Sequence, residues 1–349
     1  MNEGTTLIGA IKEIRPLKLV ITLPGSLNAT VAITEISDEL TERLSNNMSD
    51  SEDEEDSDDE NEDIDLNTMF SVGQIVRCVV IKKNIVSKKN KSNTKDQSSV
   101  SKKKIEVSLK PSIINKNRLD NIKPEMNIYG SVSAEEDYGY IINFGDSTKS
   151  GFLKKSKDIK LQVGQPLELL VDSSYSKKKP TIPVTINGVN ENISKGGELS
   201  LTSLCAGILA EVKIIDVVDT GLIVRLFEFF NATIPINQID SLNRPLSKQY
   251  SKGDMIKARI ILIDYENKVI SMGLKQHIIN WIPYEFPVSI GDSFDNAKVV
   301  HSINDLGLYL SIPKMNQLVF VHVSKNIIIM KNISNINILY YIFLDIIYF

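Results

Sequence analysis

A short pattern recurs at regular intervals along the 349-residue chain. It consists of an Asp, one further residue, a Gly and then an alternating apolar run, and its glycines are Gly139, Gly221 and Gly307. The spacings between these glycines are 221 − 139 = 82 and 307 − 221 = 86 residues. A fixed period of this kind is typical of an array of one structural unit, and it constrains the fold more than any single-residue motif does.

The third copy shows the unit most clearly. Residues 207–218 alternate apolar and polar side chains over their middle, which is the period of a half-buried strand. Gly221 allows a tight turn, residues 222–227 return as a second strand, and residues 232–239 are typical of a third. Residues 252–275 hold two more strands around an Asp-Tyr-Glu-Asn turn. Short strands with a long connection between the third and the fourth predict a small Greek-key barrel.

The first copy carries two insertions. Its first hairpin covers residues 9–23, with Lys18 where the other copies have glycine. The distance from Lys18 to Gly139 is 139 − 18 = 121 residues, and an acidic run of 17 residues (49–65) and a basic run of 23 residues (82–104) account for the excess over the period. Loops of a barrel tolerate such insertions at little entropic cost. Its remaining strands are predicted at residues 29–37, 72–81 and 104–111.

The net charge of −4 is unevenly distributed. The acidic run 49–65 holds 12 of the 44 acids and no base, which leaves 40 − 32 = +8 on the remainder. Blocks of like charge repel and cannot form a core, so both runs are expected to be disordered. The basic run is open to three readings: a phosphate-binding arm, a nuclear-import patch or a solvated loop. The acidic run is either a solubilising loop or a phosphorylated segment, with acceptor serines at Ser49, Ser51 and Ser57.

The sequence therefore predicts an all-β chain of tandem five-stranded barrels with disordered charged inserts. The predicted units are residues 4–112, 122–204, 207–277, a partial unit at 285–324 and an Ile/Asn-rich tail at 325–349. The tail has two interpretations. It is a divergent or aberrant terminus, or it is a membrane anchor, although its apolar run is short and is interrupted by asparagines and an Asp.

Four stretches resemble the S1 RNA-binding repeat, an OB-fold barrel. They are VDTGLIVRL (218–226), VFVHVS (319–324), KGDMIKARIILID (252–264) and KIEVSLK (104–110). Divergent S1 repeats in tandem, with an acidic insert in an early barrel, resemble the eukaryotic multi-S1 ribosomal RNA biogenesis factors over residues 4–324. This resemblance implies a scaffold of the nucleus and nucleolus that acts in pre-ribosomal RNA processing. Its implied partners are single-stranded RNA and ribosome-assembly proteins, with no membrane and no small-molecule substrate.

The resemblance also implies where RNA would bind. S1 repeats stack bases on aromatic side chains beside the hairpin glycine and on a third-strand His, while cations meet phosphates. Carried over residue by residue, these positions fall on non-aromatic side chains in the first repeat (Leu17, Val20, Ala32) and in the third (Thr220, Ile223, Pro235). Tyr138 and Tyr309 are alternatively strand residues that half cover a barrel. The predicted RNA-binding residues are Tyr138, Tyr140, Lys154, Lys155, Tyr309 and His322.

Enzyme signatures do not occur in the sequence. It contains no Gly-rich phosphate loop before a helix, no GxSxG and no HExxH, so we predict no catalytic residues and no cofactor. Cys78 and Cys205 match no metal or redox spacing and are expected to be buried in a reducing compartment; no metal site is predicted. Trp281 is expected to pack between the third and fourth barrels. Two other function classes remain open: a protein-interaction scaffold without RNA contact, and a translation or transcription factor.

Overall fold

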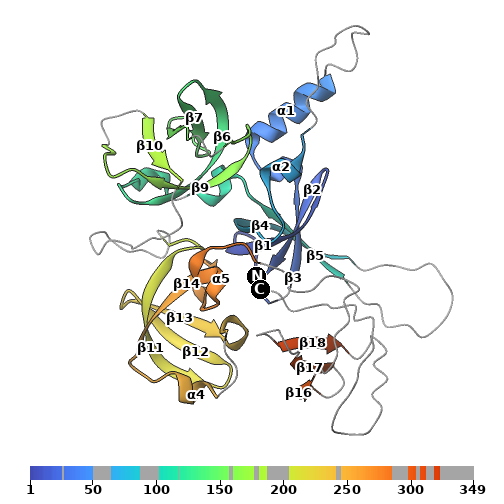
Figure 1. The fold of residues 1–349 in the computed structure, drawn as a ribbon, viewed down its shortest axis with the longest axis vertical. Helices are drawn as coiled ribbons and strands as arrows, with labels where there is room; N and C mark the ends of the chain where they lie inside the picture. Colours follow the sequence, from blue (N-terminus) through green and yellow to red (C-terminus); the bar gives the residue numbers. More distant parts are fainter. Residues whose placement is uncertain are drawn as a thin grey trace, which may run out of the picture.

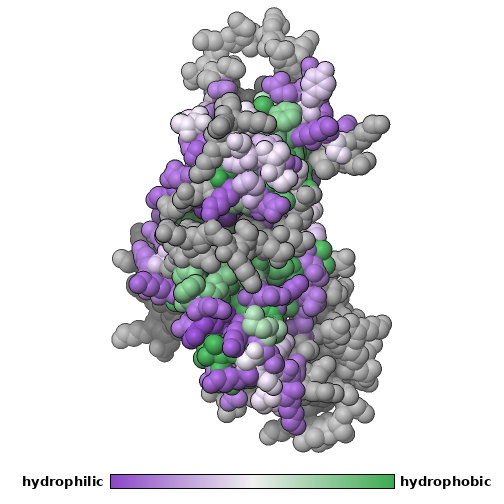
Figure 2. All heavy atoms as spheres, turned by 90° about the vertical axis from the view of Figure 1, so that its left-hand side faces the viewer, coloured by the Kyte–Doolittle hydropathy of each residue, from purple (hydrophilic) through white to green (hydrophobic). Residues whose placement is uncertain are grey.

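The computed structural model shows a chain built mainly of β-strands (Figure 1). On the face shown in Figure 2, hydrophilic side chains are interspersed with apolar patches. The structure describes residues 1–25, 27–49, 64–86, 102–116, 118–156, 160–176, 181–186, 204–240, 245–284, 298–303, 307–311 and 318–322.

Barrel 1 contains the first five strands. They are β1 (Thr6–Arg15), β2 (Lys18–Leu23), β3 (Leu27–Ala32), β4 (Ile75–Val86) and β5 (Lys102–Ser108), in the order β1-β2-β3-β5-β4, and pairing of β1 with β4 closes the ring. The long connection between β3 and β4 carries three short elements: η1 (Ile33–Glu35), α1 (Asp38–Ser49) and α2 (Leu66–Met69). This is the predicted Greek-key order, with the long connection between the third and fourth strands.

Barrels 2 and 3 repeat this order. Barrel 2 is closed in the order β10-β8-β7-β6-β9. In barrel 3 the order is β11-β12-β13-β15-β14, and β11 pairs with β14. The elements of barrel 2 are β6 (Asn127–Glu136), β7 (Gly139–Asn143), β8 (Ser150–Lys154), β9 (Pro166–Val171) and β10 (Thr181–Thr185), preceded by α3 (Pro111–Ile114) and η3 (Leu119–Asn121). Those of barrel 3 are β11 (Leu209–Val218), β12 (Gly221–Leu226), β13 (Phe230–Pro235), η5 (Ile236–Gln238), α4 (Leu246–Gln249), β14 (Met255–Asp264), β15 (Val269–Gly273) and α5 (Gln276–Asn280).

The fourth unit is a three-stranded sheet in the described region. It contains β16 (Lys298–Ile303), β17 (Gly307–Ser311) and β18 (Leu318–His322), paired in that order. The all-β prediction of tandem five-stranded OB-type barrels is thus confirmed. The exact unit boundaries stay predictions, and the tail 325–349 lies outside the described residues. In the described part of the chain, no helix is both long and apolar enough to cross a membrane.

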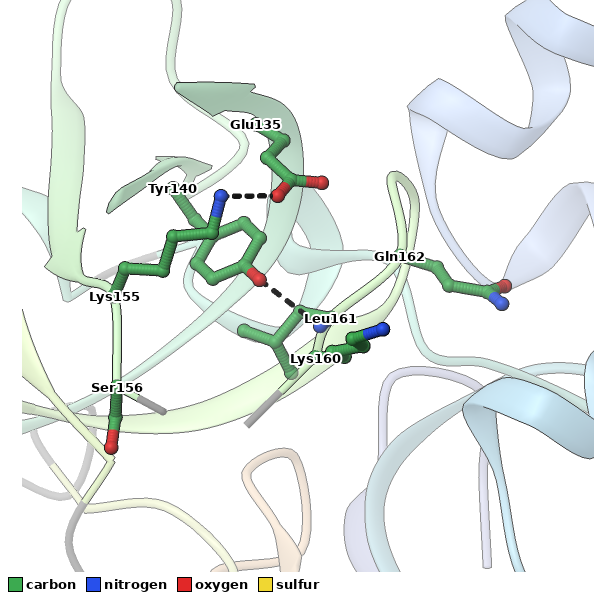
Figure 3. A pocket seen from close by; sticks show the side chains of 7 residues that line it. All are labelled: Glu135, Tyr140, Lys155, Ser156, Lys160, Leu161 and Gln162. Carbon is green, nitrogen blue, oxygen red and sulfur yellow. Dashed lines mark hydrogen bonds and ion pairs between the residues drawn. The ribbon is translucent and has the colours of Figure 1, made fainter. Parts of the chain in front are cut away.

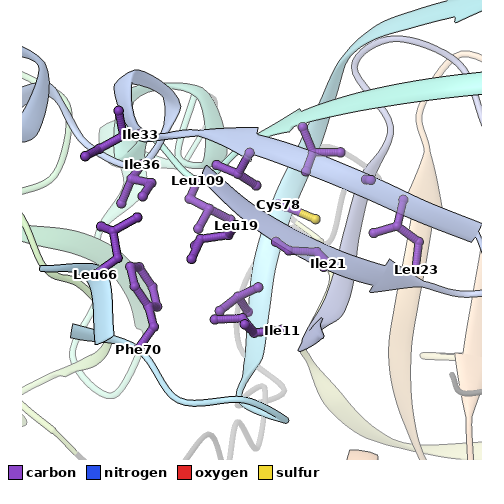
Figure 4. Packing of buried hydrophobic residues seen from close by; sticks show 14 of the residues in the cluster. Ile11, Leu19, Ile21, Leu23, Ile33, Ile36, Leu66, Phe70, Cys78 and Leu109 are labelled. Atoms are coloured by element: carbon purple, nitrogen blue, oxygen red, sulfur yellow. The ribbon is translucent and has the colours of Figure 1, made fainter. Parts of the chain in front are cut away.

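Each complete barrel has its own core. Alternate side chains of the strands point inward, as in β12, where Leu222, Val224 and Leu226 are buried. Figure 4 shows the same packing in barrel 1, where strand residues such as Leu19 and Ile21 meet Phe70 from the long connection. Burial of these apolar side chains is the main contribution to the stability of each barrel.

The strand registers confirm how the copies align. The hairpin glycines pair with equivalent third-strand positions: Gly139 with Lys154, Gly221 with Pro235 and Gly307 with His322. In barrel 1, Lys18 pairs with Ala32 in the same way, which confirms that Lys18 replaces the glycine. Gly221 is the first residue of β12 rather than a turn residue. It has a φ of +148°, and an added Cβ would overlap the carbonyl oxygen of Ile234 on β13.

Barrels 1 and 3 are joined by paired strands and an apolar cluster. Thr6 and Leu7 of β1 pair with Ile263 and Leu262 of β14. Trp281 packs against this junction, so the expectation that it lies between the third and fourth barrels is wrong. The reason is local: α5 ends at Trp281 with a left-handed conformation, and the Trp281 ring lies 5.1 Å from the Arg259 guanidinium of β14. The apolar cluster contains Ile8, Ala10, Ile75, Ala206, Ile261 and Ile278.

Barrels 1 and 2 are also in contact. Arg77 of β4 is fully buried, and its guanidinium donates to Glu168 Oε2 of β9 at 3.0 Å and to Cys205 Sγ, in the segment before barrel 3, at 2.9 Å. The Glu39 carboxylate of α1 accepts hydrogen bonds from Ser131 Oγ at 2.8 Å and Asn143 Nδ2 at 2.7 Å. Three barrels with separate cores therefore form one connected body.

The structure corrects the expectation of disorder at both ends of the basic run. β4 continues to Val86 and β5 begins at Lys102, and these two residues pair with each other, so the run begins and ends in a two-stranded ribbon. Residues 87–101 lie outside the described part of the chain, as do residues 50–63 of the acidic run. The last acid of that run, Asp65, caps α2 by accepting a hydrogen bond from the Asn67 amide at 2.9 Å.

Candidate nucleic-acid interface

Three side chains with the chemistry of an RNA contact lie where β7 begins and β8 ends in barrel 2. Tyr138 stands at the turn directly before β7 and is 82% exposed. Lys154 ends β8, is exposed and pairs in register with Gly139. Since residues two apart in a strand share a face, Phe152 lies on the same side as Lys154. The hairpin thus presents two aromatic rings and one cation to solvent.

The sequence reasoning missed Phe152. Its ring is half-buried and lies over Gly139, where an added Cβ would come within 2.6 Å of Phe152 Cζ. The hairpin glycine therefore leaves space for an aromatic ring from the neighbouring strand. The sequence did contain a signal for Phe152, because it stands two residues before Lys154 in an alternating strand and therefore on the same face.

Tyr140 belongs to the core and not to the outward face. It is 2% exposed and packs with the apolar cluster of barrel 2, and its hydroxyl accepts a hydrogen bond from the Leu161 amide at 3.4 Å. The strand period explains this position, because Tyr140 lies between two residues of the outward face, Gly139 and Ile141. A ring buried on both faces cannot stack a base, so the predicted RNA contact of Tyr140 is corrected to a core role.

Lys155 points to the same side as Tyr140. Its ammonium pairs with the Glu135 carboxylate at 2.5 Å and lies 5.7 Å from the centre of the Tyr140 ring (Figure 3). The hydrogen bond to Glu135 raises the pKa of Lys155. Lys154 has no ion-pair partner among the described residues. Of the two neighbouring lysines, Lys154 is therefore the one whose charge is available to a phosphate.

A pocket opens beside this ion pair. It has a volume of about 700 Å³. Figure 3 shows the Lys155 side chain reaching across it toward Glu135, with the Tyr140 hydroxyl below. Its wall includes a second cation, Lys160. The lining residues are Glu135, Tyr140, Lys155, Ser156, Lys160, Leu161 and Gln162.

In the fourth unit the backbone places the predicted residues at equivalent positions. Tyr309 lies on β17 and pairs with Phe320 of β18, as Ile141 pairs with Phe152 in barrel 2. His322 pairs with Gly307, as Lys154 pairs with Gly139. Tyr309, Phe320 and His322 therefore occupy the register positions that Ile141, Phe152 and Lys154 hold in barrel 2.

Barrels 1 and 3 have different side chains on this face. Val20 pairs with Thr30 on barrel 1, and Ile223 pairs with Thr233 on barrel 3. These side chains are aliphatic or short and polar, in agreement with the sequence analysis. No base-stacking group occupies these four positions.

The described residues contain no cluster of three or more His, Cys, Asp or Glu that could hold a metal ion. Cys78 and Cys205 are both buried as free cysteines, and burial raises the pKa of the Cys78 thiol. Burial also lowers the pKa of His277 to about 4, so this histidine is neutral at physiological pH. These groups are structural parts of the barrels and their junctions.

Comparison with known families bears directly on barrel 3. Residues 206–275 match the sequence model of a family described as "S1 RNA binding domain". This segment is similar to S1 domains. It coincides with barrel 3, and barrels 1 and 2 have the same strand order as barrel 3. The domain that matches the family therefore has an outward hairpin face without aromatic side chains.

Whole-chain relatives extend the comparison. The chain is 27% identical over 322 residues to "rRNA biogenesis protein RRP5" of Arabidopsis thaliana, which covers 90% of this chain and 16% of that protein. It is 27% identical over 286 residues to "Protein RRP5 homolog" of Homo sapiens, covering 78% of this chain and 14% of that protein. "Small ribosomal subunit protein bS1" of Rickettsia typhi is 25% identical over 217 residues, covering 58% of this chain and 36% of that protein. The chain thus spans about a sixth of the length of the RRP5 proteins.

Proposed function

We propose that this chain is a non-enzymatic RNA-binding scaffold of tandem S1 domains that acts in pre-ribosomal RNA processing and ribosome biogenesis. The observation that carries the proposal is the outward face of the β7–β8 hairpin, where Tyr138, Phe152 and Lys154 stand together. The S1 family match of barrel 3 and the RRP5 relatives support the RNA class and the process. The same relatives support a location in the nucleus and nucleolus and ribosome-assembly proteins as further partners.

The chemistry of this face suits single-stranded RNA. Bases have two flat faces that stack on aromatic rings, and each such stack contributes about 1–3 kcal/mol. Tyr138 and Phe152 provide the rings, while Lys154 provides a charge for the phosphate backbone. One hairpin therefore supports weak binding, and several faces on one chain raise the effective concentration of RNA at each.

Fluorescence anisotropy with a labelled oligouridine tests the proposal. We expect Phe152→Ala and Tyr138→Ala each to weaken binding by about fivefold or more, since each removes one stacking ring. Leu17→Ala is the matched control, because Leu17 is 66% exposed on the barrel 1 hairpin at the position equivalent to Tyr138. The plot of log K against log salt should be linear, with a slope of about −0.7 per phosphate contacted.

Circular dichroism of each variant checks that the barrels remain folded. Equal affinities for wild-type protein, Phe152→Ala and Tyr138→Ala would contradict RNA binding at this hairpin. No binding at low salt would favour the second candidate function, a protein-interaction scaffold. That candidate has specific support from barrels 1 and 3, whose hairpin faces present Val20, Thr30, Ile223 and Thr233 in place of aromatic rings.

A further inference from the structure

A row of exposed side chains crosses four strands of barrel 3, away from the family-type hairpin position. Asn231 of β13 pairs with Arg225 of β12, Arg225 pairs with Lys213 of β11, and Lys213 pairs with Met255 of β14. All four side chains are exposed. Neighbouring strands lie about 4.8 Å apart, so the row extends about 14 Å around the barrel. We call Asn231, Arg225, Lys213, Met255 and the adjacent Phe229 the lateral strip.

Phe229 is held outward by the turn that contains it. Phe227 and Glu228 both have left-handed backbone conformations, with φ of +50° and +65°, which bulky residues rarely adopt. Phe227 and Phe230 pack against the core of barrel 3, while Phe229 between them is 78% exposed. Strained backbone of this kind tends to occur at functional sites. The turn thus fixes one aromatic ring in solvent at the end of the strip.

The strip carries two cations, and two exposed acids lie beside it, Glu211 on β11 and Glu228 in the turn of Phe229. Lys213 and Arg225 form no ion pair with any residue that the structure describes, and their cross-strand neighbours at the outer ends of the row, Met255 and Asn231, are neutral. Lys252 is exposed and adds a further cation near the strip. The amide of the next residue, Gly253, donates a hydrogen bond to the carbonyl of Ile214 on β11, which directly follows Lys213. The lower part of Figure 2, where barrel 3 faces the viewer, shows apolar side chains between hydrophilic ones.

The strip is distinct from the position at which the resemblance places RNA on an S1 repeat. That position on barrel 3 is occupied by Thr220, Ile223 and Pro235, which offer neither a stacking ring nor a charge. The strip instead combines an exposed aromatic side chain, a flexible Met and unpaired cations on β11, β12, β14 and the β12–β13 turn. Interleaved cations and aromatic rings are the composition of surfaces that bind single-stranded nucleic acid.

We propose that the lateral strip is a second binding site for single-stranded RNA. A base stacks on Phe229, and Lys213 and Arg225 meet consecutive phosphates of the same strand. This inference rests on the proposed RNA-binding function, but it assigns barrel 3 a contact that the sequence analysis did not give it. It explains how the domain that matches the S1 family retains an RNA site although its hairpin face lacks one.

Tryptophan fluorescence tests the stacking contact. In Phe229→Trp, oligouridine should quench the new tryptophan saturably, because stacking on a base quenches its emission. The wild-type protein, with Trp281 as its single tryptophan, gives the background. Phe229→Ala should weaken RNA binding by about fivefold or more, the equivalent of about 1 kcal/mol for one lost stack. Val269→Ala is the matched control, since Val269 is also exposed on barrel 3.

The salt dependence tests the charges. The double variant Lys213→Gln/Arg225→Gln should reduce the magnitude of the log–log salt slope by about 1.4, which is two phosphate contacts at about 0.7 each. The control Lys116→Gln/Lys268→Gln removes two exposed cations outside the strip and should leave the slope unchanged. Equal slopes for both double variants would overturn the proposal.

Two further outcomes separate the strip from the proposed function. In a Tyr138→Ala/Phe152→Ala background, quenching of Phe229→Trp by RNA should persist, because the two sites are independent. RNA binding by anisotropy without quenching of Phe229→Trp would overturn this inference and leave the proposed function intact. Saturable quenching by an oligoglutamate peptide, without competition by RNA, would also overturn it and assign the strip to an acidic protein partner.

Discussion

The contact of Arg77 with Glu168 is the sharpest test of whether the barrels form one body. Arg77 has no exposed surface, and the Glu168 side chain is 13% exposed, with 3.0 Å between Nη2 and Oε2. Two unit charges about 4 Å apart attract by about 4 kcal/mol at an effective dielectric constant of about 20. Nearby Tyr129 is also buried, and its burial, together with the Glu168 charge, raises the pKa of that phenol well above its usual value.

We expect Glu168→Gln to destabilise the chain by about 3 kcal/mol, because it leaves the buried guanidinium without a counter-charge. This loss corresponds to a factor of about 150 in the unfolding equilibrium. By contrast, Arg77→Met/Glu168→Leu removes both charges and replaces them with apolar side chains of similar size. That double variant should lie within about 1 kcal/mol of the wild type, or exceed it.

Urea denaturation followed by circular dichroism measures both free energies of unfolding, and Glu136→Gln, an exposed acid on barrel 2, is the control. A loss below about 0.5 kcal/mol for Glu168→Gln would refute the reasoning, because a change of that size is typical of a solvent-exposed pair. It would mean that water enters the junction and that barrels 1 and 2 are not docked as described.

Three further predictions concern single residues. Gly221→Ala should cost about 2 kcal/mol or more in urea denaturation, since the added Cβ would overlap the Ile234 carbonyl; a loss below about 0.5 kcal/mol would contradict the role of the close approach. Lys154→Gln should reduce the magnitude of the RNA salt slope by about 0.7, while Lys155→Gln should change it less, because Lys155 is already paired with an acid; equal effects would contradict this assignment. The folded-state pKa of His277, about 4, lies below its usual value of 6.5, so the unfolded chain binds the proton first on acidification. Stability contributed by the neutral ring is complete above about pH 6.5 and is lost by up to about 3 kcal/mol as the pH falls toward 4; His277→Leu should flatten that part of the profile, and an unchanged profile would contradict it.

The sequence was sufficient for the repeated part of the fold. The hairpin period aligned Gly139, Gly221 and Gly307, and the registers confirm that alignment down to Lys18 and its partner in barrel 1. This success has a physical cause, since a barrel hairpin is local: the alternation of its side chains and the close approach at its glycine depend on residues near in sequence.

The junctions could not be predicted in the same way, because they depend on residues far apart in sequence. Arg77 stands in an apolar run, IVRCVV, in which every residue is buried. A continuous apolar run indicates a strand covered on both faces, which was the available signal for a contact outside the barrel. Neither the partner Glu168 nor the position of Trp281 follows from that signal, since both require the placement of the other barrels.

The sequence identified only part of the candidate site, and the alternation of side chains along a strand explains which part. Tyr138, in the turn before β7, and Lys154 are exposed, while Tyr140 and Lys155 are each one residue from a position of the outward face, Gly139 and Lys154, and point to the opposite side. A shift of one residue in a strand exchanges the two faces, so neighbouring residues cannot share one role. Applying the period of two from Lys154 would have identified Phe152, and applying it from Gly139, the register partner of Lys154, would have excluded Tyr140.

The joined barrels change how several weak sites act together. On a flexible string, the effective concentration of a second site depends on the length of the linker. Here the pairing of β1 with β14 and the burial of Arg77 between barrels 1 and 2 hold the β7–β8 hairpin and the lateral strip in one frame. A strand of RNA that reaches both sites then loses little additional freedom at the second contact, and a strand too short to reach both binds only one. If RNA binds at both proposed sites, we expect selectivity for longer single strands from the frame itself, without any contact that reads their sequence.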